Sequence, residues 1–240
     1  MEGNFKEDVR DGKWKYWFES GILESEGYYK NDLQDSLWVY WYRDGSKWKQ
    51  GNYKTNLREG LWTIWFESGK KLQEGNYKAG KEDGLWISWY NDGQRKDEGI
   101  YSNGKMNGAW SGWFKNGKMN YQGFCKDDLK EGQWKFWFEN NKPQEEGGYL
   151  KGEKDGKWIT WFETGAKFSE GEFKNGKPNG HWTYYYETGV KFQEQNFKDE
   201  KLDGNSTTWY ENGKVKNVSS YVVYKEKNRL VSKPDGKWLI

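Results

Sequence analysis

The sequence predicts an all-β protein in which β-hairpin repeats follow one another in a single elongated array. The first reason is a tryptophan that opens each unit and recurs every 24 residues with no insertion, because a fixed period of this size is typical of stacked supersecondary units. The second reason is the composition, since 33% of the residues are hydrophobic but 20% are aromatic, so aromatic side chains must replace an aliphatic core. The leading tryptophans are Trp14, Trp38, Trp62, Trp86, Trp110, Trp134, Trp158 and Trp182.

Each unit contains the signals of two strands and two turns. A five-residue aromatic run, such as Trp-Thr-Ile-Trp-Phe at residues 62–66, has the length and composition of a strand. A sequence such as Asn91-Asp92-Gly93 follows, and it predicts a tight hairpin turn because Asp-Gly and Asn-Gly tolerate positive φ. The second strand, as at residues 73–78, ends in a looser glycine-bearing connection like that of residues 175–180. About nine such units are expected, with a partial first unit at residues 1–13.

The repeat weakens after about Lys198. Ser206 replaces the leading tryptophan, and Gln195 and Ser219 replace the glycine of the second strand. A last copy of the motif, at residues 234–238, is out of the 24-residue phase. We therefore expect a repeat array over residues 1–213 and a C-terminal capping segment over residues 214–240 that closes the last strand edge.

Alternation along the first strand places the leading tryptophan on one face of the sheet and a second aromatic residue, three positions later, on the other face. Because a sheet can leave one face in water, we predict that the second set, called here the middle aromatic row, binds a partner. Its members are Trp17, Trp41, Trp65, Trp89, Trp113, Trp137, Trp161, Tyr185 and Trp209. The alternative is that the second-strand aromatics fold over this row and cover it. Those residues are Tyr29, Tyr53, Tyr77, Tyr101, Tyr149, Phe173, Phe197 and Tyr221.

Two charged rows share a face of the second strands. Glu or Gln recurs before the glycine, and Lys recurs four residues later. We interpret them as a solvated ladder of opposite charges and not as paired carboxylates that perform chemistry. The acidic row is Glu26, Gln50, Glu74, Glu98, Gln122, Glu146, Glu170 and Glu194, and the basic row is Lys30, Lys54, Lys78, Lys126, Lys174 and Lys198.

The sequence favours no catalytic residue, metal site or cofactor. Cys125, the single cysteine, stands where other units carry Tyr or Phe and is expected to be a buried filler. His181, the single histidine, is interpreted as a substitution in the turn before Trp182. The glycines belong to hairpins and match no phosphate-binding motif before a helix. We therefore expect a protein that is not an enzyme.

Charge and hydropathy narrow the partners. The formal net charge is +2, and residues of both signs are interleaved, so the charge does not indicate nucleic acid as a binding partner. No apolar run reaches the length of a transmembrane helix, and the first residues lack the pattern of a secretory signal, so a cytoplasmic location is expected. Peripheral lipid contact and the oligomeric state stay open.

The string Glu-Gly-x-Tyr-Lys-x-Gly-Lys-x-x-Gly-x-Trp-x-x-Trp-Tyr-x-x-Gly occurs at residues 74–93, and again at residues 170–189 with Phe173 for Tyr and Tyr185 for Trp. It resembles the MORN repeat, and more closely the bacterial MORN variant of the YwqK-family antitoxins, over roughly residues 1–221. The resemblance implies an antiparallel MORN-like meander that serves as an interaction scaffold and, for the variant family, an antitoxin role. The unit is about one residue longer than the usual MORN repeat and richer in tryptophan, so known lipid and partner preferences do not transfer directly.

These observations leave several function classes. The first is a non-enzymatic scaffold of antitoxin or immunity type that binds a protein partner, with a toxin as one candidate. The alternative is a carbohydrate- or choline-binding aromatic repeat protein, in which rings stack on sugars or surround a quaternary ammonium group. Single-stranded nucleic acid stacked on the aromatic row is a third, and the acidic row argues against it.

Overall fold

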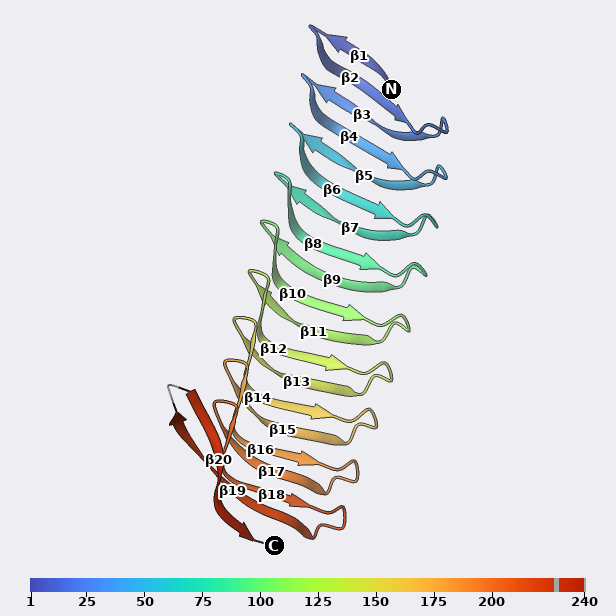
Figure 1. The fold of residues 1–240 in the computed structure, drawn as a ribbon. Helices are drawn as coiled ribbons and strands as arrows, with labels where there is room; N and C mark the ends of the chain where they lie inside the picture. Colours follow the sequence, from blue (N-terminus) through green and yellow to red (C-terminus); the bar gives the residue numbers. More distant parts are fainter. Residues whose placement is uncertain (227–228, 240) are drawn as a thin grey trace. The chain divides into compact units, whose positions relative to one another are not determined.

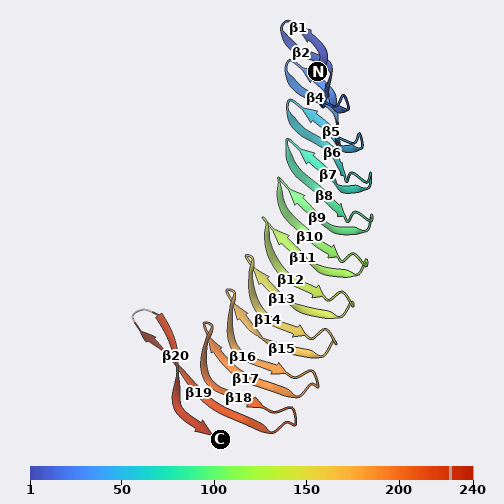
Figure 2. The ribbon, with the colours of Figure 1, turned by 45° about the vertical axis from the view of Figure 1, so that its right-hand side comes forward.

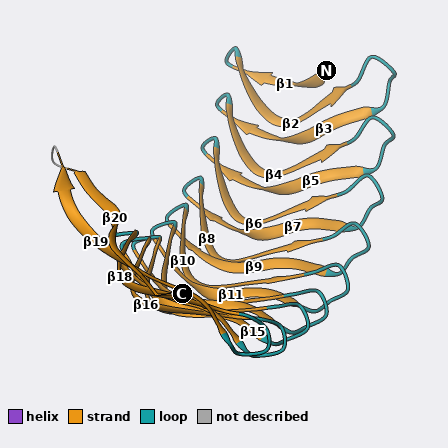
Figure 3. Ribbon diagram, turned by 60° about the horizontal axis from the view of Figure 1, so that its bottom comes forward, coloured by secondary structure: helices purple, strands orange, loops and turns teal. Residues whose placement is uncertain are grey.

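The computed structural model describes residues 1–226 and 229–239 of the chain, and for residues 236–239 it describes the backbone alone. The described residues form β-strands and turns without any helix, as Figure 3 shows, so they contain no helix that could cross a bilayer. They divide into two compact units, Met1–Gly117 and Lys118–Ile240. Within each unit, consecutive hairpins lie side by side (Figure 1, Figure 2). The predicted all-β hairpin-repeat class is confirmed.

Every strand pairs antiparallel with the next strand of its own unit. The strands of the first unit are β1 (Glu2–Lys6), β2 (Val9–Trp17), β3 (Leu23–Lys30), β4 (Leu33–Trp41), β5 (Lys47–Lys54), β6 (Leu57–Trp65), β7 (Lys71–Lys78), β8 (Lys81–Trp89), β9 (Arg95–Ser102) and β10 (Lys105–Trp113). The strands of the second unit are β11 (Met119–Lys126), β12 (Leu129–Trp137), β13 (Pro143–Leu150), β14 (Glu153–Trp161), β15 (Lys167–Lys174), β16 (Lys177–Tyr185), β17 (Lys191–Lys198), β18 (Lys201–Trp209), β19 (Val215–Glu226) and β20 (Arg229–Leu239).

Two kinds of turn alternate along the chain. The turn after the longer strand was predicted to be the tight one, but it is the longer of the two. After β6, residues 66–70 form the longer turn, in which the Phe66 amide donates to Lys70 O and the Gly69 amide donates to Phe66 O, both at 2.9 Å. After β7, only Ala79 and Gly80 separate the strands, with φ of 49° and 82°. Two consecutive positive φ values are those of a type I′ turn, whose twist matches that of the strands it joins. The connection expected to be loose is therefore the tighter one.

The first strand of each repeat begins earlier than the aromatic run predicts. β6 begins at Leu57 and β8 at Lys81, so the glycine-bearing segment before the tryptophan is strand. Both strands end at the middle aromatic residue, and the next residue, such as Phe66, begins the turn. Gly60 and Gly84 take φ of 68° and 78°, and this left-handed conformation produces a bulge instead of ending the strand.

The bulge places the leading tryptophan over the preceding strand. In the β7–β8 pair, Gly75 is opposite Trp86 but Asn76 is opposite Asp83, so β8 carries two additional residues at this point. The indole of Trp86 lies on Gly75, where a Cβ atom would stand 2.2 Å from the indole Cδ2. The Trp86 Nε1 donates to the backbone oxygen of Asn76 at 3.1 Å. Glycine is required because the indole occupies the place of a side chain.

We call this arrangement the Gly–Trp seat, and it recurs along both units. Its glycine and tryptophan pairs are Gly3 and Trp14, Gly27 and Trp38, Gly51 and Trp62, Gly75 and Trp86, Gly99 and Trp110, Gly123 and Trp134, Gly147 and Trp158, and Gly171 and Trp182. Trp110 differs from the others, since its buried indole N–H has no acceptor among the described residues. The bulge beside it is also different, because Gly108 takes φ of 136°.

The core is a ladder of aromatic rings on one face, called here the core face. Second-strand aromatics fill the spaces between leading tryptophans in edge-to-face geometry: the Tyr53 ring is 6.4 Å from that of Trp38 and 5.1 Å from that of Trp62. Seven of the eight leading tryptophans are at most 5% exposed. Burial of a large aromatic side chain contributes roughly 4 to 6 kcal/mol as an upper estimate, so these rings supply the main stabilisation of a sheet that has no second layer.

Near the end of the array both residues of one Gly–Trp seat are replaced together. Gln195 replaces the glycine and Ser206 replaces the tryptophan, and the two residues face each other across β17 and β18. The last hairpin is longer than the others, and it sets Ser219 opposite Trp238. The motif that is out of phase in the sequence therefore returns to the structural register. Of the predicted capping segment, residues 227–228 and 240 lie outside the described residues; its capping role and the boundary at residue 213 stay predictions.

Candidate interaction surface

The middle aromatic row lies on the face of the sheet opposite the core face. This follows from strand alternation, because the middle aromatic residue stands three positions after a leading tryptophan in an uninterrupted part of the strand. Trp17 is 36% exposed, and the other members are half-buried or close to it. The row is thus an accessible aromatic surface at the ends of the longer strands. Its role in partner binding stays a prediction.

The second-strand aromatics do not cover this row, which corrects the alternative stated above. They lie on the core face and contact the leading tryptophans, as Tyr77 does at 6.1 Å from Trp62 and 5.0 Å from Trp86. The alternative fails because the cross-strand register, and not alternation within one strand, decides which rings meet. Tyr77 is opposite Gly60 on β6, two residues before Trp62 on the same face.

Lysine side chains lie over the rings of the middle aromatic row. The Lys71 Nζ is 5.5 Å from the Trp89 ring centroid, and it is also 2.7 Å from a carboxylate oxygen of Glu74. The Lys47 Nζ lies 5.2 Å from the Trp65 ring in the same way. Tyr185 and Trp209 have equivalent lysines, Lys167 and Lys191. The surface therefore repeats a unit of ring, ammonium and oxygen acceptor, which is a glutamate carboxylate beside Lys71, Lys167 and Lys191 and the Gln50 amide beside Lys47. Cation–π contact holds the lysine stem against the ring.

The predicted acidic row is present, but its partners are not the predicted basic row. Glu74 and Glu170 pair with a lysine three residues earlier in the same strand, at 2.7 and 3.3 Å. Glu26 and Glu146 pair with a lysine of the neighbouring longer strand, at 3.0 and 3.5 Å. These ion pairs are exposed to solvent, which screens them, so they add little to stability. Their main effect is to keep the surface overall uncharged beside the rings.

Tyr185 modifies this pattern within the second unit. Its hydroxyl donates to a Glu170 carboxylate oxygen at 2.8 Å. This hydrogen bond is the largest cause of a lowered pKa of Glu170. Burial, followed by the bond to Glu170, raises the pKa of Tyr185 to about 12. The phenol therefore stays protonated at neutral pH and fixes the carboxylate beside the row.

In the first unit, leucines extend the middle aromatic row into a wider apolar surface. Leu61 and Leu85 stand four residues before Trp65 and Trp89 on the same face of β6 and β8, and they are 53% and 51% exposed. Leu37 is 46% exposed at the equivalent position of β4. In the second unit the equivalent positions are polar, with Gln133, Lys157, His181 and Asn205. The exposed leucines four residues before the middle aromatic residue are therefore a feature of the first unit, whereas the second unit exposes Phe124 (45%) and Leu150 (46%) on the same face at second-strand positions.

Cys125 is 3% exposed, and burial raises the pKa of its thiol, as expected for a core filler. His181 lies in β16 and not in the predicted turn; its Nδ1 is 3.2 Å from Asn196 Oδ1 and its Nε2 is 3.2 Å from Thr183 Oγ1. This row of groups resembles a nucleophile, base and orienting amide. However, Thr183 is only 6% exposed, and Thr63, at the equivalent position, has no histidine nearby in sequence and bonds Glu74. A structural role explains both hydroxyls.

Metal-ligating side chains do not gather anywhere in the described part of the chain, where no group of three or more His, Cys, Asp or Glu residues could hold an ion. Sequence reasoning did miss a cluster on the core face of the first unit, around Trp48, Lys49 and Arg58. The sequence did contain one indication of this cluster, because Trp48 is one of the two tryptophans outside the repeat positions.

Comparison with known proteins identifies one family. The sequence model described as MORN repeat variant matches residues 10–31, 58–79, 82–103, 130–151, 154–175, 178–199 and 202–222, which together make up more than half of the chain. Each matched stretch begins at the second residue of the first strand of a repeat and continues into the second strand that follows it. No curated protein matches the chain.

Two solved structures align with most of the chain at low similarity. They are described as "Crystal Structure of TcdB2-TccC3" and "Crystal Structure of TcdB2-TccC3-Cdc42". They cover 93% and 94% of this chain at 8% and 9% sequence identity, with TM-scores of 0.18 and 0.17. The chain spans 16% of the length of each.

Proposed function

Because the chain belongs to the MORN repeat variant family, whose repeats generally serve in interactions with proteins and membranes, we propose that it is a non-enzymatic scaffold that binds a protein partner. The partner class that we favour is a toxin, which would make the chain an antitoxin or immunity-type protein. The observation that carries the proposal is the middle aromatic row with the exposed leucines beside it. A half-buried row of rings that repeats every 24 residues offers an extended contact surface for a protein partner. An active site, in contrast, depends on a few unique residues and not on a repeated row.

Two features of this surface favour protein over sugar or choline. The rings of Trp65 and Trp89 already hold lysine ammonium groups, so a quaternary ammonium ligand would have to displace them. The neighbouring Leu61 and Leu85 are exposed and apolar, and such side chains match a protein surface better than a hydroxylated sugar. The cytoplasmic location remains a prediction from the sequence.

The test is capture of the partner from the native host and by co-expression with the product of the adjacent gene. Leu61→Lys combined with Leu85→Lys should abolish stoichiometric capture, because both side chains are exposed and their loss removes contact area without opening the core. Leu150→Lys is the matched control, since Leu150 is 46% exposed but lies at the end of β13 in the second unit. Recovery of no stoichiometric protein, or equal recovery by the double variant, would overturn the proposal.

A further inference from the structure

Lys49 and Glu145 occupy the same position of the repeat on the core face, four periods apart. Lys49 stands opposite Tyr40 on β4, and Glu145 stands opposite Phe136 on β12. Both strands face the longer strand of the next repeat in the same register. The repeats that contain Lys49 and Glu145 can therefore be compared at this site, and they differ in the sign of the charge, whereas Asp97 at the same position of the first unit is acidic.

In the second unit a carboxylate lies between two cations. Glu145 accepts from the Lys154 Nζ at 2.8 Å. Burial lowers the pKa of Lys130, and the charge of Glu145 partly opposes this shift. Both lysines lie over rings of the core face: Lys154 is 3.8 Å from the Trp158 ring centroid, and Lys130 is 4.6 Å from that of Trp134. The carboxylate thus compensates two partly buried ammonium groups, as a buried charge requires.

Around Lys49 in the first unit the environment differs, with two cations and no carboxylate between them. The Lys49 Nζ lies 4.0 Å from the Trp48 ring and 4.6 Å from the Tyr40 ring. Arg58, at the position of Lys154, lies over the Trp62 ring at 4.7 Å and donates to the Tyr77 hydroxyl at 2.8 Å. Within the described residues, neither Lys49 nor Arg58 forms a salt bridge.

The groups packed around this pair are mostly neutral. Tyr40 and Tyr53 approach each other through their hydroxyls at 3.5 Å, and Gln34 donates to the Tyr40 hydroxyl at 3.3 Å. The acidic side chains near the cluster include Glu82 on β8, which affects Tyr77, and Glu24, which lines the adjoining pocket. Burial is the main cause of a lowered pKa of Lys49, and the charge of Arg58 adds to it. Two half-buried cations therefore share one site without the counter-charge that the second unit supplies.

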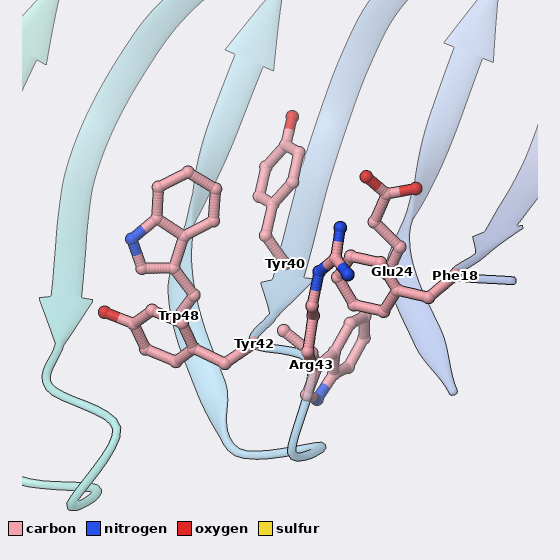
Figure 4. A pocket seen from close by; sticks show the side chains of 7 residues that line it. Phe18, Glu24, Tyr40, Tyr42, Arg43 and Trp48 are labelled. Carbon is pink, nitrogen blue, oxygen red and sulfur yellow. The ribbon is translucent and has the colours of Figure 1, made fainter. Parts of the chain in front are cut away.

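An apolar pocket adjoins this pair. It has a volume of about 230 Å³ and is lined by Phe18, Glu24, Tyr40, Trp41, Tyr42, Arg43 and Trp48. In Figure 4 the rings of Trp48 and Tyr42 lie on one side of Arg43, and Glu24 and Phe18 lie on its other side. Trp48 and Tyr40 belong both to the pocket and to the contacts of Lys49, so the cationic site and the pocket are continuous.

We propose that the core face around Lys49 and Arg58 binds the carboxylate of an acidic peptide segment, whose neighbouring apolar side chain enters the pocket beside Trp48. The bound carboxylate takes the place that Glu145 holds in the second unit, and the pocket accounts for the apolar neighbour. Lys49 and Arg58 lie on the face opposite the middle aromatic row, although Trp41 of that row also lines the pocket. Variants at Lys49 and variants at Leu61 and Leu85 test the two surfaces separately, so this proposal can fail while the proposed scaffold function holds, and the reverse.

The test uses the full chain labelled with ¹⁵N and two acetylated, amidated peptides, Gly-Glu-Leu-Phe-Gly and its isostere Gly-Gln-Leu-Phe-Gly. Binding is followed through the indole N–H signal of Trp48. The glutamate peptide should bind about tenfold more tightly than the glutamine peptide, because a hydrogen bond to a charged group is worth more than a neutral one. Equal affinities would overturn the proposal.

Lys49→Glu is the informative variant. It recreates the charge of the second unit, so Arg58 gains an internal partner, the protein becomes no less stable to urea, and the preference for the glutamate peptide disappears. Lys54→Glu is the control, because it makes the same charge change at an exposed position on the other face of β5 and should leave the preference intact. Vesicles of phosphatidylserine and phosphatidylcholine provide the last arm: Lys49-dependent vesicle binding without peptide discrimination would mean a membrane ligand and would overturn the proposal.

Discussion

Gly75→Ala is the substitution that tests the Gly–Trp seat most directly. The added Cβ would stand 2.2, 2.4 and 2.5 Å from Cδ2, Cε2 and Cγ of Trp86, and carbon atoms in ordinary contact are about 3.5 to 4.0 Å apart. The indole must therefore move by more than about 1 Å. A movement of this size breaks the hydrogen bond from the Trp86 Nε1 to Asn76 O, which is 3.1 Å long.

The expected cost follows from these two effects. Overpacking costs about 1 to 3 kcal/mol, and a buried N–H left without an acceptor costs about 1 to 3 kcal/mol. The ceiling is the loss of the whole indole, since Trp→Ala in a core costs about 3 to 5 kcal/mol. We expect about 3 kcal/mol for Gly75→Ala. In a Trp86→Ala background the same change should be neutral or slightly stabilising, because alanine restricts the unfolded chain more than glycine does.

The assay is a double-mutant cycle by urea unfolding, with hydrogen exchange of the β7 and β8 amides as the local measurement, because repeat arrays need not unfold in a single step. Gly69→Ala is the matched control: no atom lies within 4 Å of its added Cβ, and only its φ of 79° opposes the change. That control should cost about 1 to 2 kcal/mol. Additive costs of Gly75→Ala and Trp86→Ala, or a Gly75→Ala cost below that of the control, would refute the reasoning.

Three further predictions concern charge and the end of the array. The neighbouring guanidinium of Arg10 lowers the pKa of Asp32 in the folded protein. The stability that the Asp32 carboxylate contributes is therefore complete above the usual carboxyl pKa and is lost as the pH falls through the lowered folded pKa. Between about pH 6 and pH 2 the urea midpoint should drop more steeply for the wild type than for Asp32→Asn, and parallel curves would contradict this. Tyr185→Phe should raise the pKa of Glu170 in a carboxyl NMR titration, and an unchanged value would count against the hydrogen bond. Ser206→Trp alone should destabilise by about 1 to 3 kcal/mol because Gln195 stands where the indole would lie, and adding Gln195→Gly should make it stabilising; independent effects in urea unfolding would be inconsistent with the seat.

The repeat and its turns could be predicted from the sequence because they depend on residues close together in the chain. Asn141 illustrates this, since it takes the φ of 72° expected of the glycine that it replaces, and its amide donates to Phe138 O at 2.9 Å. The leading tryptophans were likewise assigned correctly to one face, because alternation within a strand fixes which side chains share it.

The placement of the second-strand aromatics could not be predicted in this way. It depends on the register between strands, and a bulge shifts that register by two residues between Gly75 and Asn76. One signal was present: where the chain loses the leading tryptophan, at Ser206, it also loses the glycine, at Gln195. The cationic site at Lys49 could not be predicted either, because the contacts of Lys49 and of Glu145 depend on the register as well.

The Gly–Trp seat has a consequence for how such a gene can change in length. Each Gly–Trp seat is formed by two successive repeats, because one repeat supplies the glycine and the next supplies the indole. The seat therefore lies at the junction between two repeats. Recombination between any two tryptophan codons of the leading series leaves a junction of the same kind behind. Whole 24-residue modules can thus be duplicated or lost in one event, and copy number becomes a heritable variable that selection can adjust separately from the stability of each module.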